Sequence, residues 1–100
     1  MGKYVFEYYD SSDGSNSGDN DAWMGWFKEL GDKVMDAGNP FGGNGMAVEK
    51  SGVSKIENFP CTGYTIVKAD NMEEAVEIAK GCPLMKSDKT AVRVYEALPM

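Results

Sequence analysis

Histidine is absent from this 100-residue sequence, and cysteine occurs only twice, at Cys61 and Cys82. Without histidine the chain has no Ser–His or Cys–His nucleophile pair and no imidazole general base. Two cysteines alone cannot complete a tetrahedral zinc site. We therefore exclude these mechanisms and expect no metal and no cofactor. Both cysteines fall near the same end of the predicted fold, and we expect reduced, partly buried thiols rather than a disulfide or redox pair.

Positive charge and long apolar runs are also scarce. Ten Lys and Arg residues stand against sixteen Asp and Glu, which gives a net charge of −6, and the basic residues are scattered. Such a chain repels phosphate backbones and anionic lipid surfaces, so nucleic acid and membranes are poor partners. No apolar run approaches the ~20 residues that a membrane helix requires. The N-terminus enters a strand pattern directly, without a signal peptide, and a cytoplasmic location is expected.

The chain length and the pattern of apolar residues predict a single domain over residues 1–100 with the element order β-α-β-β-α-β. Aromatic, β-branched and alternating segments mark the strands, and apolar stripes with capping signals mark the helices. The predicted strands are Lys3–Tyr9, Met46–Ile56, Gly63–Ala69 and Thr90–Ala97, and the predicted helices run from Asp21 to Ala37 and from the Asp70–Glu73 capping box to Gly81. Right-handed crossovers then give an α+β, ferredoxin-like fold: a four-stranded antiparallel sheet, in the order 4-1-3-2, with both helices on one face.

The first predicted helix carries a dense aromatic cluster. Trp23, Phe27, Leu30 and Val34 recur at helical spacing and form the stripe expected in the core. Trp26 lies off that stripe, which makes it a candidate for stacking on a ligand. Gly38 is expected to end the helix.

Three stretches of the sequence resemble the YCII-related (DGPF-type) family. They are Trp23–Leu30, Gly38–Gly42 and, most specifically, Gly63–Pro83, in the family's order. The resemblance implies a ferredoxin-like protomer that pairs sheet to sheet with a second copy as a dimeric α/β barrel. The family's relatives include small lactone-handling and dehalogenating enzymes. This sequence departs from the pattern before the third strand, where Glu57–Thr62 replaces the Asp-Gly-Pro-Phe segment.

Strand parity predicts which residues line the face of the sheet that the helices leave bare. Tyr4, Phe6, Tyr8, Val92 and Val94 form the more apolar sets and suit the helix side. That assignment leaves Glu7, Tyr9, Arg93 and Tyr95 on the bare face, inside the predicted barrel.

These four residues are the candidates for function. Glu7 and Arg93 are predicted cross-strand neighbours, and they are weak candidates for a general base and an anion-binding group. Tyr9 and Tyr95 are candidate ligand-binding residues. A structural ion pair inside a dimer interface is the favoured alternative for Glu7 and Arg93.

The aspartates of residues 10–21 invite comparison with a calcium loop. They lack its spacing and its closing glutamate, so a solvated loop is the favoured interpretation.

Three functions remain open. The chain could be a small-molecule-binding barrel, including a cofactor-independent isomerase, lyase or dehalogenase. It could be a non-catalytic accessory domain that binds a metabolite or a protein, or a structural homodimer module without a ligand.

Overall fold

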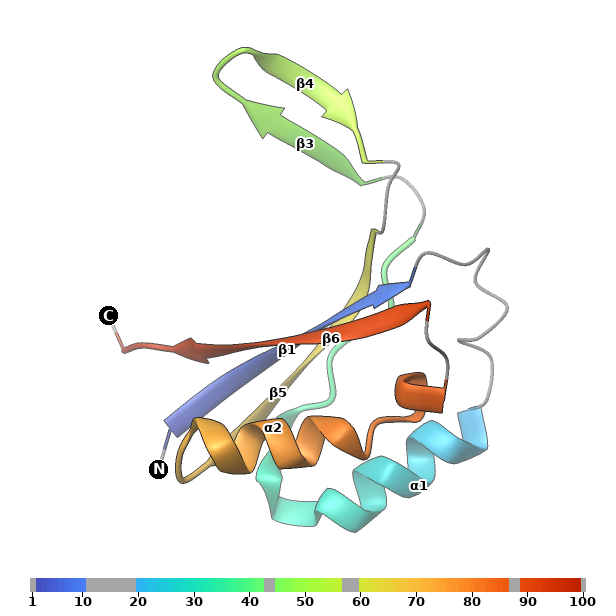
Figure 1. Cartoon of the computed structure of the whole chain (residues 1–100), viewed down its shortest axis with the longest axis vertical. Coiled ribbons are helices and arrows are strands. Elements are labelled where there is room, and N and C mark those ends of the chain that lie inside the picture. Colours follow the sequence, from blue (N-terminus) through green and yellow to red (C-terminus); the bar gives the residue numbers. More distant parts are fainter. Residues whose placement is uncertain (1, 11–19, 43–44, 57–59, 87–88, 100) are drawn as a thin grey trace.

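The computed structural model describes residues 2–10, 20–42, 45–56, 60–86 and 89–99. Four strands form one antiparallel sheet in the order β2-β5-β1-β6. Helices α1 and α2 both lie on one face of this sheet (Figure 1). The predicted ferredoxin-like α+β class is therefore confirmed. The strands of the sheet are β1 (Gly2–Asp10), β2 (Val34–Asp36), β5 (Cys61–Ala69) and β6 (Thr90–Ala97), and the helices are α1 (Asn20–Leu30) and α2 (Met72–Lys80), with one-turn 3₁₀ segments η1 (Gly31–Lys33) and η2 (Pro83–Lys86).

The core lies between the sheet and the two helices. Alternate residues of β1 and β5 point toward the helices and are buried, which is the period of two that a strand imposes. Ala75 and Ala79 of α2 are buried against them, and their small side chains let the helix approach the sheet closely. The largest contribution from β1 is Phe6, which is fully buried and stacks on Trp26 with ring centroids 6.3 Å apart.

Helix α1 ends at Leu30 rather than at the predicted Ala37. Gly31 adopts φ +55°, a left-handed conformation that glycine tolerates and that ends a helix. The chain then makes η1 and enters β2 at Val34, so Val34 belongs to a strand and not to the helical stripe. Trp26, predicted off the stripe, is the buried residue of α1, whereas Trp23 and Phe27 are only half-buried.

The predicted second strand, Met46–Ile56, is also corrected. It is two strands, β3 (Met46–Glu49) and β4 (Gly52–Lys55), joined by a two-residue turn at Lys50 and Ser51. They form a separate hairpin sheet, and the edge position beside β5 is taken by β2 instead. The single predicted strand becomes two because the chain reverses direction at residues 50–52. The sequence pattern at Ser51 and Gly52 was interpreted as an interruption within one strand, and it is a turn.

The N-cap of α2 lies one residue later than predicted. The side chain of Asn71 accepts a hydrogen bond from Glu74 N at 2.8 Å, and Glu74 Oε1 accepts one from Asp70 N at 3.0 Å. This reciprocal pair satisfies donors at the start of the helix.

Residues 11–19 lie outside the described part of the chain, so most of the aspartate-rich loop does too. Across the described ranges, no helix has the length and apolar character needed to cross a membrane.

Candidate functional site

The face of the sheet opposite the helices, here called the open face, is arranged in rows of cross-strand neighbours. Neither α1 nor α2 covers it (Figure 1). Across β5, β1 and β6 the successive rows are Lys68–Lys3–Ala97, Ile66–Val5–Tyr95, Tyr64–Glu7–Arg93 and Cys61–Tyr9–Ala91. The open face therefore changes along the strands from a basic row through an apolar row to rows that carry polar and aromatic groups.

Glu7, Tyr9 and Arg93 form one connected cluster on the open face. The structure confirms the predicted register, in which Glu7 lies directly opposite Arg93. No ion pair within 4.0 Å joins these two described residues; Tyr9 connects them instead. Its hydroxyl donates a hydrogen bond to Glu7 Oε1 at 2.7 Å, and the Arg93 guanidinium carbon lies 4.5 Å from the centre of the Tyr9 ring.

Hydrogen bonding to Glu7 raises the pKa of Tyr9 to about 12, with desolvation as the second cause. The positive charge of Arg93 acts in the opposite direction and is the smallest contribution. At neutral pH Tyr9 is therefore a protonated phenol that orients the Glu7 carboxylate. The guanidinium lies over an aromatic face, an arrangement that leaves its planar N–H groups able to bind an anionic or carbonyl oxygen.

Tyr64 completes the row of Glu7 and Arg93, and it is not among the candidate residues predicted from the sequence. Its ring packs on Phe41 with centroids 5.8 Å apart, and Asn39 Nδ2 donates to its hydroxyl at 3.4 Å. Phe41 and Asn39 follow β2 and reach the sheet through a hydrogen bond from Phe41 N to Thr62 O at 2.9 Å. Parity applied to the third strand, as it was to the first and last, would have placed Tyr64 beside Glu7.

Tyr95 lies on the open face as predicted, but in the neighbouring apolar row with Val5 and Ile66. It is 50% exposed, and Val5 and Ile66 are half-buried. Tyr95 is thus one row away from the Glu7–Tyr9–Arg93 cluster, two residues from Arg93 along β6.

Trp26 is not brought together with the other four candidates. It is 6% exposed and belongs to the core on the helix side of the sheet, where it packs against Trp23 and Phe27 as well as Phe6. The placement gives Trp26 a packing role in the protomer.

The two cysteines are free and lie in different surroundings. Cys61 is half-buried opposite Tyr9 in the β1–β5 ladder. Cys82 is buried in the core, where desolvation raises its pKa to about 12 and keeps it a thiol. Within the described ranges, no group of three or more potential metal-ligating Cys, Asp or Glu side chains occurs.

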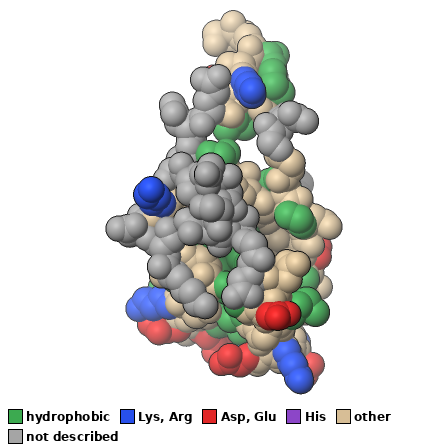
Figure 2. Space-filling view, turned by 90° about the vertical axis from the view of Figure 1, so that its right-hand side faces the viewer, with side chains coloured by type: hydrophobic (Ala, Val, Ile, Leu, Met, Phe, Trp, Pro, Cys, Tyr) green, Lys and Arg blue, Asp and Glu red, His purple; other side chains and the backbone are tan. Residues whose placement is uncertain are grey.

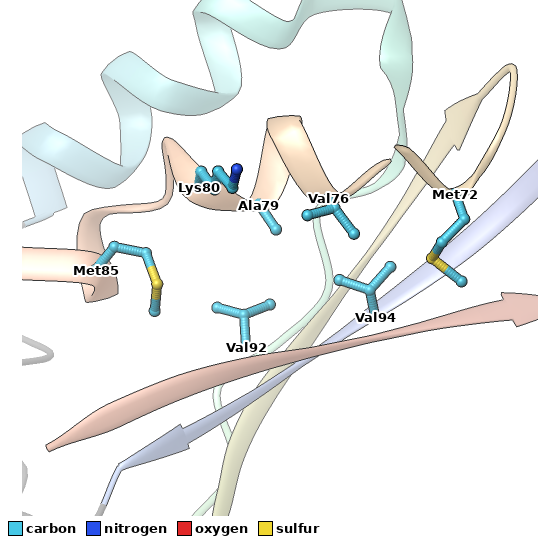
Figure 3. A pocket seen from close by; sticks show the side chains of 7 residues that line it. All are labelled: Met72, Val76, Ala79, Lys80, Met85, Val92 and Val94. Carbon is cyan, nitrogen blue, oxygen red and sulfur yellow. The ribbon is translucent and has the colours of Figure 1, made fainter. Parts of the chain in front are cut away.

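A recess lies on the helix side of the molecule, between α2, η2 and β6. It is a shallow groove of about 310 Å³ lined by Met72, Val76, Ala79, Lys80, Met85, Val92 and Val94. Figure 3 shows Val76 facing Val92 and Val94 across the gap. Lys80 is the one charged residue of this lining, so the groove lacks the converging polar groups of an active site.

Comparison with protein-family models and with curated proteins finds no match for this chain. Among solved structures, the chain is similar to 5-chloro-2-hydroxyhydroquinone dehydrochlorinase (TftG) from Burkholderia phenoliruptrix AC1100, solved in complex with 2,5-dihydroxybenzoquinone. The TM-score is 0.64 at 16% sequence identity, over 93% of this chain and 90% of that chain. At this identity the likeness shows a shared fold.

Proposed function

We propose that two copies of this chain pair open face to open face as a dimeric α/β barrel and bind a small molecule between the two sheets. The observation that carries the proposal is the open face itself. It has an apolar row beside a Glu–Tyr–Arg cluster, and neither helix covers it. A second copy would bury the apolar row and enclose the cluster in a cavity. The shared fold with TftG supports this assembly.

The chemistry of the cluster suits a ligand with anionic or carbonyl oxygens. Arg93 would hold an anionic or carbonyl oxygen, and Glu7, oriented by the Tyr9 hydroxyl, would act as a base. Tyr9 and Tyr64 would offer ring faces for stacking. The solved structure of TftG holds a dihydroxybenzoquinone, and we extend that ligand class, a small hydroxylated ring, to this chain.

If the site is catalytic, its residues suit a proton-transfer reaction. Glu7 would accept a proton from the ligand while Arg93 stabilises the developing oxyanion. This is the chemistry of cofactor-independent isomerases, lyases and dehalogenases, and it uses no imidazole.

The test is a titration of the full chain with 2,5-dihydroxybenzoquinone, followed by amide chemical shifts in two-dimensional NMR. We expect the shifted resonances to cluster at residues 7, 9, 64 and 93. Arg93→Ala should weaken binding at least tenfold, whereas Lys28→Ala, which removes an exposed cation on α1, should leave it unchanged. Intact-mass measurement excludes a covalent adduct as the source of the shifts.

Equal binding by the Arg93→Ala variant would remove Arg93 from the site. Shifts confined to Met72, Val76 and Met85 would relocate binding to the α2–β6 groove.

The alternative function is a non-catalytic structural or accessory interaction module. The exposed apolar groove between α2 and β6 favours it, because such patches are typical of protein-binding surfaces. This alternative predicts no shift at residues 7, 9, 64 and 93 with the quinone.

A further inference from the structure

The hairpin formed by β3 and β4 stands apart from the rest of the molecule. Within the described part of the chain, its two strands pair with each other and with no strand of the main sheet. It projects on the side of the sheet away from α1 and α2, which is the side of the open face (Figure 1). Figure 2 shows hydrophobic side chains on its surface at the top of the molecule.

One face of this hairpin is mainly apolar, and Lys55, opposite Met46, is its one charged residue. Met46 and Val48 share that face because they are two residues apart on β3, and Val53 joins them as the cross-strand neighbour of Val48. Their side chains are 54%, 77% and 62% exposed, respectively. The opposite face carries Glu49 from β3 and Ser54 from β4.

An isolated two-stranded hairpin has little stability of its own in water, and packing against another body is what normally supports it. In this hairpin more than half of the surface of each of the three apolar side chains is exposed to solvent. Covering these side chains would remove apolar surface from water, which is the main favourable contribution to association. The apolar side chains of the hairpin are therefore available to pack against another body.

A second copy of the chain is the occupant that the observations favour. Because the hairpin projects on the open-face side, a body that docks on the open face lies next to it. Charge also agrees: the hairpin strands and turn carry Lys50 and Lys55 against the single Glu49, whereas the chain as a whole has a net charge of −6. A slightly basic arm and an acidic body attract each other.

We propose that the β3–β4 hairpin is a dimerisation arm, whose Met46, Val48 and Val53 pack on the body of the partner that covers the open face. By two-fold symmetry each protomer holds the other with its own arm. This inference rests on the sheet-to-sheet dimer proposed above and adds a second contact to it.

The experiment compares two matched pairs of substitutions in the full chain by sedimentation over a range of protein concentrations. Val48→Thr with Val53→Thr changes a cross-strand pair on the apolar face, and Ala47→Thr with Ser54→Thr changes the neighbouring pair on the other face. Threonine keeps the β-branched shape that strands favour, so both variants should fold. We expect the first variant to raise the dimer dissociation constant at least tenfold and the second to change it less than twofold. Circular dichroism verifies that each variant keeps its secondary structure.

The outcomes separate this inference from the proposed function. A wild-type dimer whose dissociation constant is unchanged by the valine substitutions would overturn the arm and leave the sheet-to-sheet dimer standing. A wild-type chain that stays monomeric at all concentrations would overturn both. A photo-crosslinking residue placed at Val48 should yield a covalent dimer on irradiation, and its failure to do so within a wild-type-like dimer would also contradict the arm.

Discussion

At the scale of single residues, Tyr9 determines how the candidate site is arranged. It lies between the carboxylate of Glu7 and the guanidinium of Arg93, and it takes the place of a direct ion pair. The phenol donates to the carboxylate and accepts the cation on its ring face. Because the pKa of Tyr9 is raised from 10.0 to about 12, its contribution to folding is fully present below pH 10 and is lost as the pH rises through about 12.

This arrangement predicts opposite pKa changes for two substitutions. Glu7→Ala removes the main cause of the raised value, so the pKa of Tyr9 should fall toward 10. Arg93→Ala removes a stabiliser of the phenolate, so the pKa should rise further. Titration of ¹³Cζ-labelled tyrosine by NMR measures both. A Tyr9 pKa that stays at about 12 in the Glu7→Ala variant would show that the hydrogen bond is not its cause.

At the scale of elements, the edge strand β2 depends on close backbone contact with β5. Thr65 Oγ1 accepts a hydrogen bond from Tyr8 at 2.6 Å and donates one to Ala37 O at 2.9 Å, which fastens the end of β2 to the sheet. The next residue, Gly38, adopts φ +81°, and a Cβ there would lie only 1.7 Å from Tyr64 O. Only glycine allows the backbone at position 38 to lie this close to the main chain of Tyr64. The close contact also places Asn39 and Phe41 beside the Tyr64 side chain.

Gly38→Ala should therefore destabilise the protein by at least about 2 kcal/mol, since it combines a left-handed backbone with a collision against main chain. Gly25→Ala is the matched control. A Cβ at this position in α1 meets nothing within 4 Å, so the variant should gain roughly 0.5–1 kcal/mol of stability. Urea unfolding gives both free energies. Equal stabilities for the Gly38→Ala variant and the wild type would contradict the contact between β2 and β5.

The elements also show what the sequence could and could not predict. Period-two alternation in residues 3–9 and 90–97 was enough to place Glu7, Tyr9, Arg93 and Tyr95 on the open face, because parity follows from local geometry. The helix end at Leu30 was missed because the apolar stripe continues to Val34, and the pattern does not reveal that Gly31 turns the chain. Trp26 was predicted to lie off the buried stripe but is buried, because burial in α1 depends on how the helix is rotated against Phe6, which is a tertiary property.

At the scale of the whole molecule, two apolar surfaces that neither helix covers lie on the same side of the sheet (Figure 1). The open face exposes the row Ile66–Val5–Tyr95, and the β3–β4 hairpin exposes Met46, Val48 and Val53. The helix side, by contrast, holds the core, with Phe6 and Val67 fully buried. A protomer with this asymmetry is expected to find its missing layer in a second copy.

The most direct test of this account is sedimentation of the full chain beside its Ile66→Lys variant. Ile66 lies in the apolar row, and a lysine there would carry a charge into the proposed contact between the sheets. We predict that the wild type sediments at twice the chain mass of 10.9 kDa and the variant as a folded monomer. A wild type that stays at 10.9 kDa, or a dimer that the lysine leaves intact, would contradict the claim that a second copy covers the open face.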